Sequence, residues 1–212
     1  MTTSYDDTVI LVYAKAPLAG SVNTRLIPDI GTDAATQLQQ DFIHHRLSML
    51  QRANLCATHL MCAPDITHDC FTQCEEQYPV VLKQQDGSEL GERMSNGAAS
   101  ALLSYKYCIV IGTDAPALDE VIIKQVIDEL HAGADVVFVP AEDGGYVLLG
   151  LTKNYEFLFN DVSWGTDKVM QQTRERLKEN NISFKELGLC WDVDTLEDYQ
   201  RYQKLLAKAE CF

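Results

Sequence analysis

The sequence lacks long hydrophobic runs and has few basic residues. No apolar segment approaches the roughly 20 residues that a membrane-spanning helix requires. The opening residues, Met1 to Asp7, are polar and do not resemble a secretory leader. Lys and Arg number 17 and Asp and Glu number 31, so the formal net charge is −14. Because nucleic acid and anionic membranes attract basic surfaces, we expect no nucleic-acid partner. The short apolar runs predict no membrane span, and the polar opening residues favour a cytoplasmic protein.

The sequence also lacks the paired cysteine motifs of common zinc sites, although it contains seven cysteines. An odd number of cysteines without a secretory leader favours reduced thiols. Several metal-binding residue types nevertheless lie close together in the sequence: Cys56, His59, Cys62, His68, Cys70 and Cys74. Their spacing does not repeat a CxxC knuckle. A structural zinc site and a group of buried thiols both fit the pattern, and buried thiols are the simpler interpretation.

Short apolar runs alternate with amphipathic segments along the whole chain. This pattern predicts strands at 8–14, 55–62, 79–84, 107–112, 135–140, 145–151 and 183–190. It predicts helices at 32–53, 66–77, 89–104, 118–132, 165–180 and 195–209. Alternating strands and helices are typical of an α/β sheet with helices on both faces.

The run YCIVIG (107–112) is apolar throughout, as expected for a buried central strand. Only AEDG separates the strands predicted at 135–140 and 145–151, which favours an antiparallel turn. We therefore predict one α/β domain over residues 1–212. It is a three-layer α/β/α sandwich with a mostly parallel, mixed sheet. Ligands of such sheets bind beyond the carboxyl ends of the central strands.

The segment AKAPLAGSVNTRL places Lys15 and Arg25 around a loop at the end of the first predicted strand. Backbone amides of a tight loop can bind phosphate where a residue such as Gly20 leaves access. Arg25 can hold a phosphate through two parallel hydrogen bonds. The loop lacks the GxxxxGK[ST] and GxGxxG patterns, so a plain strand-to-helix connection with two solvated cations fits equally well.

A carboxylate follows the central strand, because Asp114 comes directly after YCIVIGT and Pro116 ends the strand. A carboxylate in this place can hold Mg²⁺ or Mn²⁺ against a diphosphate, and it can also simply cap the following turn. In WDVDTLEDY, alternation puts Asp192 and Asp194 on one face. Thr195 and Asp198 form a capping box for the last helix, and a purely structural role for the whole segment remains open.

Three further segments have both a functional and a structural interpretation. Asp143 and Gly144 fit a hairpin turn, and the glycines beside Tyr146 would also allow a ligand close to the backbone. Trp164 can stack on a sugar or a base, or anchor the core. In QQDGSELGERM, Arg93 follows Glu89 by one turn, which is the spacing of an ordinary ion pair.

These segments together resemble one known family. KAPLAGSVNTRL is similar to the KAPxxGxVKTRL opening of small bacterial proteins classed as glycosyltransferases and assigned in part to arsenosugar biosynthesis. These proteins are relatives of the nucleotide-diphospho-sugar transferases, which have the GT-A fold. Five later segments match the same family in order: QQDGSELGERM, IGTDAPAL, VPAEDGGYVLLGL, VSWGT and WDVDTLEDY. The matches extend over almost the whole chain.

The resemblance implies a role for each segment. It implies that Asp114 and Asp194, with Asp192 in reserve, bind Mg²⁺ or Mn²⁺, and that Asp114 takes part in catalysis. It implies that Asp143 binds a sugar hydroxyl or acts as the base toward the acceptor. It implies that the nucleotide and the substrate are bound by Lys15, Gly20, Asn23, Arg25, Gly87, Arg93, Gly144, Gly145, Tyr146 and Trp164.

The resemblance also implies an activity. We expect a metal-dependent transferase with a GT-A-like fold that uses a nucleotide-activated sugar and a small-molecule acceptor. One alternative is a nucleotidyltransferase, similar to guanylyltransferases, that uses a nucleoside triphosphate and releases pyrophosphate. The family has Lys where this chain has Asn23, and the missing charge favours sugar transfer. A non-catalytic nucleotide-binding protein is a third hypothesis. No feature of the sequence indicates the oligomeric state, the base or the sugar.

Overall fold

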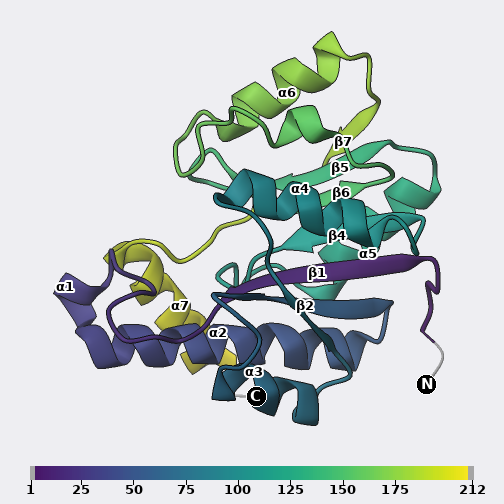
Figure 1. Cartoon of the computed structure of the whole chain (residues 1–212). Coiled ribbons are helices and arrows are strands. Elements are labelled where there is room, and N and C mark those ends of the chain that lie inside the picture. The colour runs from purple at the N-terminus through teal and green to yellow at the C-terminus, as the bar shows by residue number, and fades with distance from the viewer. Residues whose placement is uncertain (1–2, 210–212) are drawn as a thin grey trace.

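The computed structural model describes residues 3–209 and shows a seven-stranded sheet between two layers of helices (Figure 1). Along the sheet the strand order is β3-β2-β1-β4-β6-β5-β7. The bounds are β1 (Thr8–Lys15), β2 (Ala57–Ala63), β3 (Val81–Gln84), β4 (Tyr107–Ile111), β5 (Val136–Pro140), β6 (Tyr146–Leu151) and β7 (Phe184–Glu186). Only β6 runs antiparallel to its neighbours, so the predicted mostly parallel, mixed sheet is confirmed.

The strand β4 lies at the centre of the sheet, between β1 and β6, and all five of its residues are buried. The strands β5 and β6 form the predicted antiparallel pair, which begins with Val136 opposite Leu151. The register shifts between Val139 and Pro140. Proline cannot donate to a ladder and is tolerated at such irregularities. The turn between β5 and β6 lies at the same end of the sheet as the carboxyl end of β4.

Helices cover both faces of the sheet, as the sequence predicts. On one face lie α2 (Thr32–Ala53), α3 (Asp69–Gln77) and α5 (Glu120–His131), and on the other lie α4 (Leu90–Ala101), η1 (Glu156–Leu158) and α6 (Val169–Glu179). The alternation along β1 explains this arrangement, since Ile10 and Val12 belong to the first core cluster and Val9 and Leu11 belong to the second.

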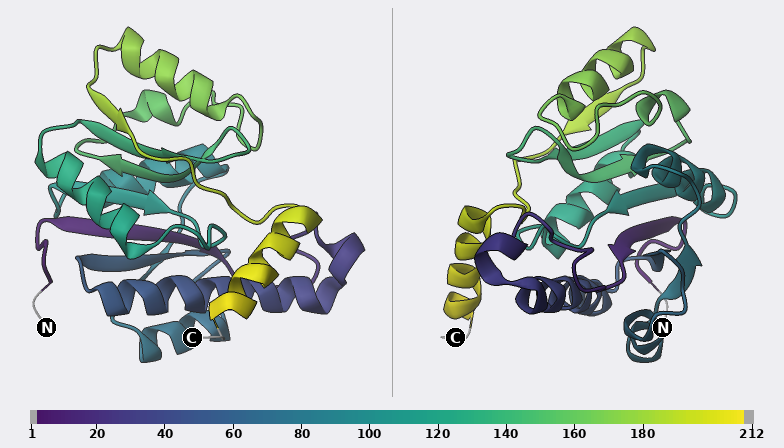
Figure 2. Two further views of the ribbon diagram at one scale, coloured as in Figure 1. Left: turned by 180° about the vertical axis from the view of Figure 1, so that it is seen from behind. Right: turned by 60° about the vertical axis from the view of Figure 1, so that its left-hand side comes forward.

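A third, smaller cluster lies at one end of the sheet, where α1 (Ile27–Ile30) and α7 (Leu196–Ala209) meet α2 (Figures 1 and 2). The rings of Phe42 on α2 and Tyr202 on α7 lie 5.2 Å apart. Trp191 and Val193 join them in the same cluster. The last helix therefore fixes the segment that precedes it against the carboxyl ends of the central strands.

The element boundaries follow the predictions with local differences. The helix at 32–53 is observed with the same bounds, whereas the helix predicted at 118–132 begins at Glu120 because the side chain of Asp119 caps it, accepting the amide of Ile122 at 2.9 Å. The short elements α1 and η1 were not predicted, since a single turn shows no periodicity. No helix among residues 3–209 is long and apolar enough to cross a membrane. The single domain over 1–212 stays a prediction, and its outermost residues 1–2 and 210–212 lie outside the described part.

We predict that Gly150→Val lowers the free energy of unfolding by about 1–3 kcal/mol, because it overpacks a filled interface. A Cβ at this position of β6 would lie 2.9 Å from Val126 Cγ1 and 3.0 Å from Leu130 Cδ1, both on α5. Chemical denaturation measures the change. Gly188→Ala is the control, since a Cβ there meets nothing within 4 Å. Equal stability of the two variants would contradict the packing of α5 on β6.

Candidate active site

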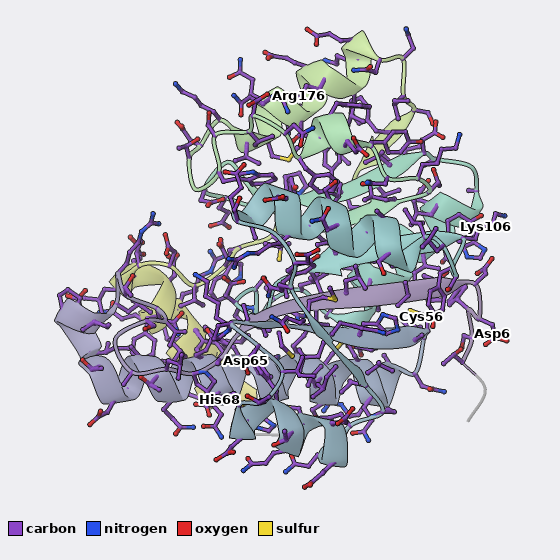
Figure 3. All side chains as sticks on the ribbon, viewed as in Figure 1. Asp6, Cys56, Asp65, His68, Lys106 and Arg176 are labelled. Carbon is purple, nitrogen blue, oxygen red and sulfur yellow. The ribbon has the colours of Figure 1, made fainter. Side chains whose placement is uncertain are left out.

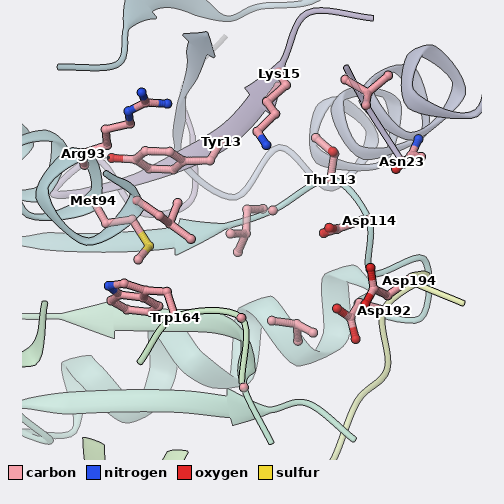
Figure 4. A pocket seen from close by; sticks show the side chains of 18 of the residues that line it. Tyr13, Lys15, Asn23, Arg93, Met94, Thr113, Asp114, Trp164, Asp192 and Asp194 are labelled. Carbon is pink, nitrogen blue, oxygen red and sulfur yellow. Dashed lines mark hydrogen bonds between the residues drawn. The ribbon is translucent and has the colours of Figure 1, made fainter. Parts of the chain in front are cut away.

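A cavity of about 620 Å³ opens at the carboxyl ends of β1 and β4 (Figure 4). Its volume is within the range typical of small-molecule sites, roughly 300–1,000 Å³. Acidic side chains and Lys15 lie at one end, and Tyr13, Met94 and Trp164 lie at the other. The cavity therefore has a charged end and an aromatic end, each formed by segments from distant parts of the chain.

Asp114 lies where β4 ends, with its carboxylate open to the cavity. The loop that carries it is held from beneath by Arg46, a fully buried residue of α2. The Arg46 guanidinium donates hydrogen bonds to the carbonyl oxygens of Ala115 and Leu118. Sequence reasoning missed Arg46, although a charged residue at the helical spacing of the buried Ile43 and Leu50 is a signal that could have found it.

Desolvation by the protein around the cavity raises the pKa of Asp114. The hydrogen bond from its own backbone amide and the charge of Arg46 act in the opposite direction, and the charges of Asp194 and Asp143 raise the pKa further. Burial also lowers the pKa of Arg46 to about 10, so its guanidinium stays charged at neutral pH. The buried cation therefore offsets part of the negative charge at the strand end. It acts on Asp114 both as a charge and as a support for its loop.

The backbone brings Asp192 and Asp194 to the same place. The amide of Val193 donates to the carbonyl oxygen of Asp114 at 2.9 Å. Val193 itself is buried in the third cluster, and both acidic side chains line the cavity beside Asp114 (Figure 4). Asp192 and Asp194 face the same cavity as predicted, although residues 191–194 form no regular strand. The predicted capping box is confirmed, because Asp198 accepts the backbone amide of Thr195 at 2.9 Å and its hydroxyl at 2.6 Å.

The acidic end concentrates negative charge. Burial, followed by the charges of Asp114 and Asp143, raises the pKa of Asp192 to about 7. Asp194 forms an ion pair with Arg25. Carboxylate oxygens that converge and repel one another fit a hard divalent cation, because Mg²⁺ and Mn²⁺ take oxygen ligands and would neutralise the repulsion. The residues Asp114, Asp192 and Asp194 could hold such an ion once their side chains rotate toward it, because their oxygens do not form a group of three within 4.8 Å of one another.

Of the four residues predicted to bind phosphate or nucleotide around the loop after β1, three line the cavity: Lys15, Asn23 and Arg25. Lys15 points toward the cavity from the end of β1 (Figure 4), and Arg25 lines the wall beside Asp194. Asn23 also lines the cavity, but its amide nitrogen donates to the carbonyl of Ala35 on α2 at 2.9 Å. Gly20 does not line it; with φ of +77° it provides a turn that other residues adopt with strain.

The segment before α4 forms another wall. Arg93 lines the cavity, and its Nε donates to the carbonyl of Gly87 at 2.9 Å. Among the described residues, Arg93 makes no ion pair with Glu89, so the simple helical pairing is not observed. Gly87 lies behind the wall, where a Cβ would be 2.8 Å from the Arg93 backbone nitrogen. The Tyr13 hydroxyl donates to the carbonyl of Arg93 at 2.8 Å; sequence reasoning did not identify Tyr13.

Two aromatic residues at the other end have polar atoms without partners. The rings of Tyr146 and Trp164 lie 6.2 Å apart in an edge-to-face arrangement. Tyr146 Oη and Trp164 Nε1 are buried, and neither has a hydrogen-bond partner within the described part of the chain. Buried donors usually have partners, but both atoms are closed off from solvent, and Trp164 Nε1 faces Gly91, where a Cβ would lie 2.6 Å from it. Trp164 also packs against the second core cluster, which is one of its two predicted roles; stacking on a ligand stays a prediction.

The hairpin turn between β5 and β6 places Asp143 and Gly145 in the cavity wall. Asp143 accepts the backbone amide of Gly145 at 2.8 Å, which is the turn contact expected from the sequence. Gly144 does not line the cavity. Its carbonyl accepts the amide of Met170 at 2.9 Å, and a Cβ would lie 2.5 Å from the backbone oxygen of Asp167. This glycine therefore allows the chain before α6 to pack against the hairpin.

Comparison with known proteins places this arrangement in a family. The model of a family described as "Uncharacterized protein conserved in bacteria (DUF2064)" matches residues 46–166, more than half of the chain. The chain belongs to this family. The DUF2064 match includes Arg46, Asp114, Asp143 and Trp164. No curated protein matches the sequence.

Solved structures show which fold this DUF2064 member has. A "putative nucleotide-diphospho-sugar transferase from Desulfovibrio desulfuricans G20" is 28% identical, with a TM-score of 0.81 over 90% of this chain and 83% of the other. A CMP:2-keto-3-deoxy-manno-octonic acid synthetase complexed with CTP is 10% identical, with a TM-score of 0.62 over 96% and 100%. The 4-diphosphocytidyl-2C-methyl-D-erythritol synthase from Anaerococcus prevotii DSM 20548 is also 10% identical, with a TM-score of 0.65 over 95% and 96%. The predicted nucleotide-diphospho-sugar transferase fold is confirmed, and the arsenosugar assignment stays a prediction.

We predict that Asp192→Asn stabilises the metal-free protein at alkaline pH. The pKa of this carboxyl rises from 3.8 to about 7 on folding. The folded state therefore binds the proton more tightly, and stability falls as pH rises between these two values. The free energy of unfolding of the variant should not fall in this range. Above pH 7 it should exceed that of the native protein by on the order of 1 kcal/mol, after allowance for solvent screening.

Thermal unfolding of both proteins in a chelating buffer, from acid to alkaline pH, measures this difference. Asp161→Asn is the control, because Asp161 is exposed and lies outside the cavity. If the melting temperatures of the native protein and Asp192→Asn differed by the same amount at every pH, the raised pKa would be contradicted.

Proposed function

We propose that this protein is a metal-dependent transferase that moves a sugar from a nucleotide-activated donor to a small-molecule acceptor. The observation that carries the proposal is the convergence of Asp114, Asp192 and Asp194 with Lys15 and Arg25 in one cavity at the carboxyl ends of the central strands. The likeness to a structure described as a nucleotide-diphospho-sugar transferase, at 28% identity, supports the same substrate class.

The charged end of the cavity suits a diphosphate. Asp114, Asp192 and Asp194 would hold Mg²⁺ or Mn²⁺, which supplies charge stabilisation for a departing nucleoside diphosphate. Lys15 and Arg25 would bind the phosphate oxygens, and Arg25 would do so through its planar guanidinium. To take this role, Arg25 must leave its ion pair with Asp194.

The aromatic end suits the sugar or its acceptor. Tyr146 and Trp164 line the cavity, and the Trp164 ring offers a flat apolar surface on which a sugar could stack. Asp143 lines the cavity, close enough to Asp114 and Asp192 for its charge to raise the pKa of both. It would accept the proton of the attacking acceptor hydroxyl. The new bond joins the acceptor oxygen to the anomeric carbon as the bond from that carbon to the diphosphate oxygen breaks.

The nucleotidyltransferase alternative differs in the bond that breaks, since it cleaves the α-phosphate bond of a triphosphate and releases pyrophosphate. The structure commits the amide nitrogen of Asn23 to the carbonyl of Ala35. Because the residue is asparagine, the loop also lacks the additional charge that a Lys at that position would supply. The observation favours sugar transfer, and the two products distinguish the activities.

We predict that Asp114→Asn abolishes the Mn²⁺-dependent rise in melting temperature caused by a bound nucleotide-sugar, because it removes one charged oxygen ligand and leaves the shape unchanged. Thermal-shift assays with UDP-, GDP-, CDP- and ADP-sugars and with nucleoside triphosphates, each with and without Mn²⁺, measure this effect. Asp161→Asn should retain the full rise. An unchanged rise in Asp114→Asn would refute the assignment of the metal site.

We predict that incubation of the stabilising sugar donor with acceptor and Mn²⁺ releases a nucleoside diphosphate and no pyrophosphate. Product analysis with a donor labelled in the sugar follows both the sugar and the phosphate. Release of pyrophosphate from a triphosphate would establish nucleotidyl transfer. Binding without turnover over a broad panel of acceptors would support the non-catalytic hypothesis.

A further inference from the structure

A cluster of soft metal-ligand atoms lies outside the cavity, between α2 and α3. One ligand atom from each of His44, Cys70 and Cys74 can be chosen so that all three lie within 4.8 Å of one another. Among the described residues, it is the only group of three or more His, Cys, Asp or Glu side chains with this geometry. None of the three lines the cavity described above, so the cluster is separate from the candidate active site.

The local structure explains why the two thiols meet. Cys70 and Cys74 are one turn apart on α3, which places both side chains on the same face of the helix. His68 fixes the start of this helix, because its Nδ1 accepts the amide of Cys70 at 3.2 Å. Both cysteines are buried, with relative exposures of 4% for Cys70 and 0% for Cys74. The thiols therefore point into the layer between α3 and its neighbours.

The imidazole comes from a different element. His44 lies on α2, next to the buried Ile43, and is itself half-buried. Its Nδ1 lies 3.1 Å from the hydroxyl of Tyr78, directly after α3, and the two rings are 5.8 Å apart. A contact of this kind fixes the ring orientation of a metal-binding histidine, and removing it typically lowers metal affinity about 10- to 100-fold.

The other cysteines and histidines in this part of the sequence do not join the three-residue cluster. Figure 3 shows Cys56 and His68 well apart, and His68 serves as the cap of α3. His59 packs edge-to-face on Tyr105. The Cys62 thiol donates to the carbonyl of Leu60 at 3.3 Å. Of the six residues that lie close together in the sequence, only Cys70 and Cys74 belong to the cluster, and its histidine, His44, comes from α2.

We propose that His44, Cys70 and Cys74 bind one thiophilic divalent cation of the zinc class, with water in the fourth position. Two thiolates and an imidazole are a ligand set that zinc accepts, whereas Mg²⁺ prefers oxygen. Zinc bond lengths and a tetrahedral angle put donor atoms roughly 3.5–4 Å apart. Because the three ligand atoms already lie within 4.8 Å of one another, small rotations of the side chains would bring them to these separations. The half-buried His44 leaves a route for the ion and the water.

The site would join α3 to α2 and would be independent of the carboxylate cavity. Binding would displace the protons of the two thiols, so the affinity rises with pH. An ion that binds only the folded chain also raises the melting temperature. The protein would then carry two metal sites of different chemistry, one lined by oxygen and one by sulfur and nitrogen.

Titration of the metal-free, reduced protein with Co²⁺ tests the proposal. We expect one equivalent to produce a thiolate-to-cobalt charge-transfer band in the near ultraviolet, and Zn²⁺ to abolish this band by displacing Co²⁺. Cys70→Ser and Cys74→Ser should each weaken or eliminate the band, and Tyr78→Phe should weaken Co²⁺ binding about tenfold. Circular dichroism shows whether each variant is folded.

Two control variants distinguish this site from the remaining buried thiols and from the carboxylate cavity. Cys56→Ser removes another buried thiol of the same core cluster and should leave the band unchanged. Asp114→Asn should also leave it unchanged, so failure of this proposal and failure of the proposed transferase site are distinguishable. Absence of the band in the native protein would show that the thiols are ordinary core residues and would overturn the proposal. A band that persists without Cys70 and Cys74, or that disappears without Cys56, would overturn it too.

Discussion

The hydrogen bond from the amide of Val193 to the carbonyl of Asp114 joins two distant segments of the chain, and the candidate active site depends on it. Beneath Asp114, the buried guanidinium of Arg46 fixes the loop after β4. On the other side, burial of Trp191 and Val193 against α7 fixes the acidic segment. The carboxylates therefore approach one another because the backbone and the core hold them there, against their own repulsion.

That repulsion has a cost in stability. A single-domain protein is stable by only about 5–15 kcal/mol, and a carboxyl whose pKa rises to about 7, as in Asp192, destabilises the charged fold. Perturbed carboxyls in a cleft are typical of functional sites. Tyr146 Oη and Trp164 Nε1, which belong to residues of the same cavity wall, are buried without a hydrogen-bond partner among the described residues, and this is a further cost in stability.

Local patterns predicted much of the fold and part of the site. The apolar run at 107–112 and the periodicity at 32–53 identified β4 and α2, and alternation placed Asp192 and Asp194 together. Sequence reasoning could not find what depends on packing between distant elements. Arg46 supports a loop far along the chain, and His44 meets α3 only in the folded state. Glycines were ambiguous as well, because Gly144 is needed for the close approach of Asp167 and does not line the cavity.

The ion pair between Arg25 and Asp194 has a consequence for the order of events at the cavity. A phosphate that takes Arg25 would leave Asp194 without its counter-charge, and a cation that takes Asp194 would leave Arg25 free for an anion. Each ligand thus frees the side chain that the other ligand binds. By linkage the two should bind with positive cooperativity, so that neither the anion alone nor the cation alone reaches the affinity it has in the presence of the other.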